Sequence, residues 1–269
     1  MSAIENGELA RSAREVRTGT TVVVGAAQGI GATVAQRLAR EAWSERVVLA
    51  DLDGAGVEQV AAELRAAGHD ATALRVDVTD AAQVDALVAA SADALRVAVV
   101  AGTFFPTPTL EVTRAQFAQI VDVNLHGAYF VAQAYARRMA AAGGGAIVGV
   151  ASIAATMPRM RQVAYCASKA AIVQALRVLG MENAAAGVRV NTVSPGLTDT
   201  PMMRTVAGDH AAVQRMADGS PEAFRPRIPD GRVATPGDVA DAIAFLLSPE
   251  SGHITLQDLV VDGGELLGR

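Results

Sequence analysis

Short apolar runs alternate with longer stretches of helical periodicity along most of the chain. The runs are rich in Val, Ile and Ala and are apolar at consecutive positions, which is typical of strands buried between two layers of helices. We expect strands at 20–25, 46–51, 71–78, 96–102, 145–152, 188–196 and 258–264. The pattern predicts a doubly wound (Rossmann) α/β fold, with a parallel seven-stranded sheet and helices on both faces.

The stretches between these runs carry apolar residues at helical spacing, most clearly at 32–42, 57–68 and 81–95, and Asp80 is placed to cap the last. A chain of 269 residues that is 51% hydrophobic can bury one large core. We therefore expect an N-terminal extension at 1–18, which a short helix would also fit, and a single domain at 19–269. An irregular segment at about 198–235 follows the sixth strand, where it would act as a substrate lid.

Charge and composition limit the classes of partner that this protein is expected to bind. The net charge of -5 and the scattered arginines disfavour a nucleic-acid role, which normally needs a clustered basic face. The single cysteine allows no intramolecular disulfide, and the four histidines lack metal-ligand spacing, so no metal is expected. The N-terminus lacks the apolar stretch of a signal peptide, and we expect no apolar run long enough to span a bilayer. These features favour a soluble cytoplasmic protein.

A glycine-rich loop directly follows the first expected strand and precedes a helix. It reads Gly25-Ala26-Ala27-Gln28-Gly29-Ile30-Gly31. Glycines at such a turn permit close backbone approach, so the helix N-terminus can face a pyrophosphate. A strand-to-helix turn can need glycines for its own geometry, but this context favours nucleotide binding.

Acidic and small residues at the ends of the next strands extend this candidate cofactor site. Asp51, with Leu52 beside it, ends the second strand, where a carboxylate can bind both adenosine ribose hydroxyls and would repel a 2'-phosphate. NAD is therefore favoured over NADP, although Asp51 or Asp53 can also be interpreted as a cap of the following helix. Further candidates follow the third and fourth strands, where ordinary turns are the alternative: Asp77, Val78, Ala101 and Gly102.

Tyr165 and Lys169 are four residues apart in a helical pattern, so their side chains rise from one face. A phenol is a poor base at neutral pH, but a nearby ammonium and a positive nicotinamide ring favour the phenolate. Lys169 is also the sole lysine in the chain. This suggests a role that a guanidinium cannot fill, such as reaching ribose hydroxyls as a compact donor.

Ser152 and Asn124 complete a candidate set of four polar groups. Ser152 follows the fifth strand, where it can donate to the substrate oxygen. Asn124 falls within a helical pattern that it suits poorly, so it can mark a kink whose freed carbonyl holds a water. A surface asparagine on a helix is the alternative.

These motifs resemble the short-chain dehydrogenase/reductase family over nearly the full chain. The matching elements are the glycine loop, Asn124, Ser152, Tyr165, Lys169, and the turn that carries Pro195 and Gly196. The resemblance implies that Tyr165 is the acid/base, that Ser152 orients the substrate, and that Lys169 binds the nicotinamide ribose and lowers the tyrosine pKa. It further implies that Asn124 supports a proton relay, that Thr198 contacts the nicotinamide carboxamide, and that the protein is a homotetramer.

Two positions depart from the family pattern. Val24 stands where a threonine usually precedes the glycine loop, and Val99 is expected in the place of the asparagine that usually opens the motif of the fourth strand. Both lost side chains would have hydrogen-bonded locally. We therefore expect an altered connection between loop and strand, with the chemistry retained.

Within the family, the C-terminal half is similar to enzymes that oxidise 2,3-dihydro-2,3-dihydroxybenzoate to 2,3-dihydroxybenzoate for catechol siderophores. The similarity lies in segments at 144–152, 157–160, 194–205 and 251–264. Related enzymes of specialised metabolism, including antibiotic biosynthesis, aromatise the amino analogue, 2,3-dihydro-3-hydroxyanthranilate. A general secondary-alcohol or 3-oxoacyl reductase is a further alternative, and a binding protein that senses NAD is the non-enzymatic one.

A substrate of this kind carries a carboxylate, which needs a cationic partner in a largely apolar pocket. The candidates are Arg159, before the catalytic tyrosine, and Arg204, on the expected lid. Either arginine can also be an ordinary surface residue. The apolar walls are expected to include Met157, Met160, Met202 and Met203.

Overall fold

A single parallel sheet organises the computed structural model, which describes residues 17–268. Most of the expected extension at 1–18 therefore lies outside the described residues. The strand order is β3-β2-β1-β4-β5-β6-β7, and every neighbouring pair is parallel, which confirms the predicted fold. The strands are β1 (Gly19–Val24), β2 (Ser44–Asp51), β3 (Ala71–Arg75), β4 (Ala94–Val99), β5 (Gly145–Val150), β6 (Val188–Pro195) and β7 (Asp258–Val261).

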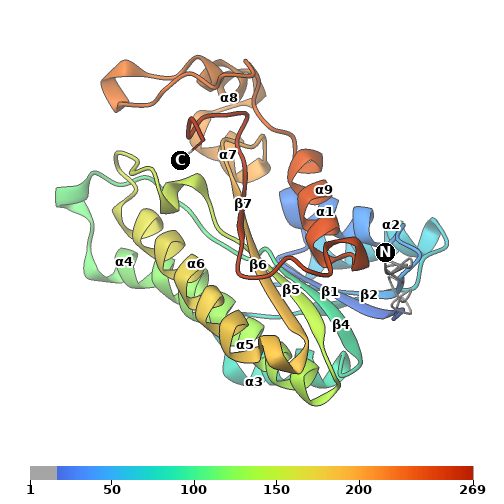
Figure 1. Cartoon of the computed structure of the whole chain (residues 1–269). Coiled ribbons are helices and arrows are strands. Elements are labelled where there is room, and N and C mark those ends of the chain that lie inside the picture. Colours follow the sequence, from blue (N-terminus) through green and yellow to red (C-terminus); the bar gives the residue numbers. More distant parts are fainter. Residues whose placement is uncertain (1–16, 269) are drawn as a thin grey trace, which may run out of the picture.

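Helices cover both faces of the sheet, and each face has its own buried apolar cluster (Figure 1). Side chains of α1, α2 and α9 fill one cluster, and those of α3, α5 and α6 fill the other. Because both faces are covered, the strands are apolar at consecutive positions. The helices are α1 (Gly29–Leu38), α2 (Gly54–Ala66), α3 (Ala81–Ala90), α4 (Arg114–Val121), α5 (Ala128–Ala141), α6 (Val163–Asn183), α7 (Pro201–Ala207), α8 (His210–Arg215) and α9 (Pro236–Leu247).

The predicted strands extended too far at their carboxyl ends. The runs ending at 78, 102 and 152 were expected to be strand throughout, but β3, β4 and β5 end at Arg75, Val99 and Val150. Apart from Asp77, the residues beyond these ends are small or apolar, so the pattern continues although the chain has left the sheet. They line a cavity instead of pairing with a neighbouring strand.

The predicted helix boundaries also differ from those in the structure. The Asp80 side chain caps α3 as predicted, because it accepts hydrogen bonds from the amides of Ala82 and Gln83. The expected helix at 81–95 ends earlier, however, and Ala94 and Leu95 belong to β4. Both residues suit a helix or a strand, and pairing of Ala94 with Thr20 of β1 decides between them.

The sequence order of the strands reverses between β1 and β4, so the loops after these two strands diverge to opposite sides. Ligands of open α/β sheets bind at such a switch point, outside the carboxyl ends of the strands. The segment after β6 forms α7 and α8, which lie together near the C-terminus at one end of the molecule (Figure 1). A small cluster of Val213, Ala217, Ile228 and Val233 holds this segment together. Its action as a lid stays a prediction.

The stretch Val163–Ala186, which includes α6, has the length and hydropathy of a membrane-spanning helix, contrary to the sequence-based expectation that no such run exists. Within the fold, this helix packs on β6 and on α5. Ile172, Leu176 and Leu179 enter the core cluster of that face. Its apolar composition is therefore explained by its place in the core.

Candidate active site

A cavity of about 780 Å³ lies at the carboxyl ends of the strands. Loops that are far apart in the sequence converge on it, and every residue predicted to bind the cofactor lines it. These residues are Gly25, Gln28, Gly29, Ile30, Gly31, Asp51, Leu52, Asp77, Val78, Ala101, Gly102, Tyr165, Lys169, Pro195, Gly196 and Thr198. The sequence prediction thus identified one site, although the contacts of each residue with a cofactor stay predictions.

The glycine loop has the close packing that a nucleotide cradle needs. A Cβ atom on Gly31 would lie 1.7 Å from the Gly25 carbonyl oxygen, and one on Gly25 would lie 2.5 Å from the Ala101 amide nitrogen. Gly25 and Gly29 also have positive φ angles of 88° and 57°, which favour glycine. Gln28 precedes α1 without a side-chain cap, so the first amides of the helix are available to an anion. These residues fit the phosphates of a dinucleotide.

The Asp51 carboxylate lies at the rim of the same cavity. It accepts hydrogen bonds from the amides of Ala27 (2.9 Å) and Asp53 (3.0 Å), which fix its position against the glycine loop. Asp53 is the residue that caps α2, by accepting from the Gly56 amide. Of the two residues that could cap this helix, Asp53 is therefore the cap, and Asp51 is not.

Asn124 lies in a π-helical turn, Asp122–Gly127, between α4 and α5, so the expected irregularity is present. Its side chain is buried and is held by Thr103, whose amide donates to Oδ1 at 2.7 Å and whose carbonyl accepts from Nδ2 at 2.9 Å. Nδ2 also lies 3.3 Å from the Ser168 hydroxyl. Asn124 therefore fixes the loop after β4 against α6, and its expected contact with a water stays a prediction.

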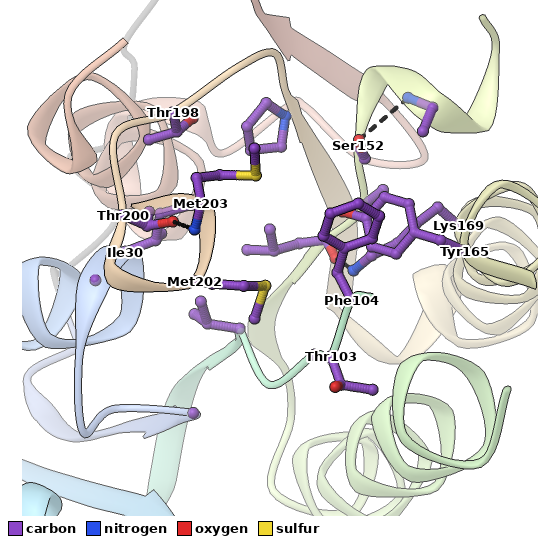
Figure 2. A pocket seen from close by; sticks show the side chains of 18 of the residues that line it. Ile30, Thr103, Phe104, Ser152, Tyr165, Lys169, Thr198, Thr200, Met202 and Met203 are labelled. Carbon is purple, nitrogen blue, oxygen red and sulfur yellow. Dashed lines mark hydrogen bonds between the residues drawn. The ribbon is translucent and has the colours of Figure 1, made fainter. Parts of the chain in front are cut away.

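Ser152, Tyr165 and Lys169 meet on one side of the cavity. Figure 2 shows Tyr165 beside Phe104, with Met202 and Met203 facing them across the pocket. Ser152 Oγ accepts from the Ala154 amide at 3.1 Å, so its own hydroxyl proton can donate to another group in the cavity. Lys169 Nζ donates to the Val150 carbonyl at 2.8 Å and lies 5.7 Å from the centre of the tyrosine ring. The three side chains therefore form one candidate acid/base centre, and their catalytic roles stay predictions.

Burial shifts the pKa values of both titratable members of this centre. Burial raises the pKa of Tyr165 above its usual 10.0, and its hydrogen bond with Ser152 opposes the increase. Burial lowers the pKa of Lys169 from 10.5 to about 8. The Lys169 ammonium donates to the Val150 carbonyl in this structure, and its expected lowering of the tyrosine pKa stays a prediction.

Residues expected to bind substrate separate into two groups. Arg159, Met160, Met202 and Met203 line the cavity, whereas Met157 is absent from its described lining. The prediction for Arg204 is wrong, because its guanidinium binds the Asp199 carboxylate at 2.7 and 3.1 Å beside a second cavity. Met202 and Arg204 are two residues apart on α7, so about 200° of helix rotation separates their directions.

Among the pocket residues that were missed in the sequence, three have contacts or burial that bear on the site. Phe104 packs edge-on against Tyr165, with ring centres 5.0 Å apart. Arg225 and Glu265 line the same cavity, and Glu265 is completely buried. No local motif marks these positions, although the aromatic pair Phe104-Phe105, one residue after the fourth expected strand, was a weak signal for Phe104.

The two departures from the family pattern also occupy this region. The residue directly before Ala101 and Gly102 is Val100, so this position, and not Val99, replaces the usual asparagine. Backbone bonds join the two loops: the Val100 and Ala101 amides donate to the Val24 carbonyl at 2.8 and 2.9 Å. The connection between the loops is therefore maintained by the backbone.

Comparison with known proteins places the chain among dehydrogenases. A family profile described as enoyl-(acyl carrier protein) reductase matches residues 25–265. The 2,3-dihydro-2,3-dihydroxybenzoate dehydrogenase of Bacillus subtilis is 36% identical, over 91% of this chain and 95% of that protein. The Escherichia coli enzyme of the same name is 43% identical over 72% of this chain and 79% of its own. Cis-4-hydroxycyclohexanecarboxylate dehydrogenase of Sinomonas cyclohexanicum is 38% identical over 90% and 94%.

Solved structures agree with this placement. A candidate NAD(P)-dependent gluconate 5-dehydrogenase from Beutenbergia cavernae, with bound NADP, has a TM-score of 0.83 and 31% identity, over 93% of this chain and 98% of that chain. The glycine cradle and the acid/base centre described above fit the same cofactor class. The chain belongs to the short-chain dehydrogenase/reductase family and is an oxidoreductase that acts on a CH–OH group with a nicotinamide cofactor.

Proposed function

We propose that the protein oxidises a ring alcohol of a cyclohexadiene carboxylic acid and so forms an aromatic acid, with 2,3-dihydro-2,3-dihydroxybenzoate as the first candidate substrate. One observation carries this proposal: Tyr165 and Ser152 share an apolar-walled cavity with Arg159. The acid/base pair suits the alcohol, the methionines suit the ring, and the guanidinium suits the carboxylate. The two relatives named for this substrate support the same assignment.

The side chains divide the chemistry between them. Ser152 donates to the substrate oxygen and orients it, while the Tyr165 phenolate accepts the hydroxyl proton. Lys169 binds the ribose hydroxyls and places a positive charge near the phenolate. A bound nicotinamide supplies the acceptor for the hydride. The resulting ketone tautomerises to the aromatic ring, which makes oxidation the favoured direction.

We further propose NAD as the cofactor, because the Asp51 carboxylate would repel a 2'-phosphate at the adenosine ribose. The Asp51→Asn variant is expected to raise the ratio of kcat/KM with NADP to that with NAD by ~10- to 100-fold. An amide oxygen can still accept from the Ala27 amide, so the loop is retained while the charge is removed. Initial rates with each cofactor measure the ratio.

Asp53→Asn provides the matched control, because Asp53 caps α2 and does not line the cavity. It should leave the cofactor ratio unchanged. Equal ratios for wild type and Asp51→Asn would show that another group selects the cofactor.

The decisive test of the proposed reaction is whether reduced nicotinamide forms, which its absorbance measures. Purified protein is mixed with NAD and with either 2,3-dihydro-2,3-dihydroxybenzoate or 2,3-dihydro-3-hydroxyanthranilate, and the aromatic product is identified by mass spectrometry. Turnover of the first acid supports the proposal. Turnover of the second alone would reassign the substrate to the amino analogue, and no turnover of either acid would overturn the aromatising function.

The proposal also sets a biological context. A catechol acid is a building block of siderophores, and antibiotic biosynthesis is the alternative use of such aromatic acids. Both uses fit a cytoplasmic enzyme with a small carboxylate substrate and without nucleic-acid or membrane partners. We also propose a homotetramer, because α4, α5 and α6 expose Phe117, Phe130, Val178 and Met181.

A further inference from the structure

Three charged residues from distant segments meet at the wall of the cavity. Arg159 comes from the loop before α6, Arg225 from the segment after α8, and Glu265 from the tail after β7. Arg159 Nη2 and Arg225 Nε lie 2.7 and 3.1 Å from the same carboxylate oxygen, Glu265 Oε1. The glutamate side chain is 0% exposed and each arginine side chain is 12% exposed. A buried carboxylate is thus paired with two cations.

The hydrogen bonding of this cluster is incomplete. Glu265 Oε2 and Arg159 Nη1 are buried and have no hydrogen-bond partner among the described residues. Buried polar atoms are nearly always paired in folded proteins, and unpaired ones are costly when they carry charge. The cluster therefore has one unused acceptor and one unused donor, together with an excess of one positive charge.

The backbone around Glu265 fixes where the unused acceptor lies. The Asp262 carboxylate accepts from the amides of Gly264 (2.8 Å) and Leu266 (2.7 Å), which holds the tail in a tight turn. A Cβ atom on Gly196 would lie 3.4 Å from Glu265 Oε2. The oxygen is therefore beside the turn after β6, which also lines the cavity.

We propose that Arg159, Arg225 and Glu265 recognise an acid that carries a hydrogen-bond donor on the ring carbon next to its carboxylate, and that Glu265 determines this specificity. The excess positive charge and the Arg159 donor suit the carboxylate, and Glu265 Oε2 accepts from the neighbouring hydroxyl or amine. This inference rests on the proposed function, because both candidate dihydro acids have this arrangement beside the carbon that is oxidised.

The test compares three aromatic acids as ligands of the protein with NADH bound. Calorimetry measures Kd for 2,3-dihydroxybenzoate, for 3-hydroxyanthranilate and for 3-hydroxybenzoate, which lacks the neighbouring donor. We expect at least one of the first two to bind wild type ~10-fold or more tightly than 3-hydroxybenzoate, because the last leaves Glu265 Oε2 unpaired. If wild type binds 2,3-dihydroxybenzoate and 3-hydroxyanthranilate no more tightly than 3-hydroxybenzoate, the proposal is overturned.

Glu265→Gln is the informative variant. Its amide oxygen must accept from the two arginines, so its NH2 group takes the place of Oε2 and cannot accept from a ligand. The measured quantity is the Kd for 3-hydroxybenzoate divided by the Kd for the tighter-binding acid that has the neighbouring donor. In Glu265→Gln this ratio is expected to fall to about one third or less of the wild-type value. Glu250→Gln, which changes an exposed carboxylate, should leave the ratio at the wild-type value. An unchanged ratio in Glu265→Gln, with a melting curve that shows a folded protein, would remove Glu265 from recognition.

Turnover separates this inference from the proposed function. If the protein oxidises either dihydro acid but binds the three aromatic acids equally tightly, the recognition role of Glu265 is overturned and the proposed function is retained. Discrimination without turnover of either dihydro acid would support recognition of the acid and overturn the proposed reaction. The dihydro acid with the higher kcat/KM identifies the neighbouring donor as hydroxyl or amine.

Discussion

Replacing Tyr165 with Phe is expected to lower kcat for alcohol oxidation by ~10³-fold, because the variant lacks the group that accepts the hydroxyl proton. The ring should remain in place, since its contact with Phe104 does not involve the hydroxyl. NADH binding, followed by fluorescence, should therefore change little. Steady-state rates at saturating substrate and cofactor measure the loss.

The pH dependence distinguishes lost chemistry from lost structure. Burial raises the pKa of Tyr165, so the fraction of phenolate, and with it wild-type kcat/KM, should increase with pH through the neutral and mildly alkaline range. The residual rate of Tyr165→Phe should lack this increase. Tyr129→Phe is the matched control, because its hydroxyl contacts Gln133. A variant at Tyr165 with near-normal kcat would show that another group accepts the proton.

Replacing Lys169 with Met is expected to increase stability and abolish most activity. Burial lowers the pKa of Lys169 from 10.5 to about 8, which corresponds to about 3 kcal/mol of destabilisation at neutral pH. Methionine removes this cost but leaves the Val150 carbonyl without its donor, so a net gain of about 1–2 kcal/mol is expected. We expect kcat to fall ~100-fold, because the ribose and the phenolate lose the ammonium. Denaturant unfolding and steady-state rates measure the two effects.

The effect of Lys169 on the free energy of unfolding should depend on pH in a specific way. The folded pKa is below the unfolded one, so the unfolded state binds more protons and wild-type stability rises as pH increases from about 8 to 10.5. The stability advantage of Lys169→Met should therefore be largest near about pH 7 and shrink towards about pH 10. Lys169→Arg keeps the charge and should gain no stability. A destabilised Lys169→Met at neutral pH would contradict the prediction.

Much of the fold could be predicted from the pattern of apolar residues. Consecutive apolar positions occur where a strand is covered on both faces, so the runs that became β1 and β6 were recognised from local sequence. Strand ends were less predictable, since Val100 and Ala151 have the same apolar character as the strands that precede them. Where a strand ends depends on where its neighbour stops pairing, which is a property of the sheet.

The residues of the candidate site also differ in whether the local sequence could identify them. Gly31, Tyr165 and Lys169 could be identified because each stands in a short motif whose spacing has a direct geometric meaning: a tight turn, or one face of a helix. Arg204 was placed on the wrong side, because the contact of α7 with Asp199 sets which face of that helix meets the cavity. The direction of the Lys169 side chain likewise depended on the Val150 carbonyl.

By itself, the sequence indicated the strands of a parallel sheet, the glycine loop and the Tyr165–Lys169 pair, since each shows in the pattern or spacing of residues close together in the chain. Only the tertiary structure brought Arg159, Arg225 and Glu265 together. These residues are separated by long stretches of sequence, and no periodicity relates them. Their pairing follows from how the tail after β7 and the segment after α8 pack over the sheet, and such packing has no local signature in the sequence.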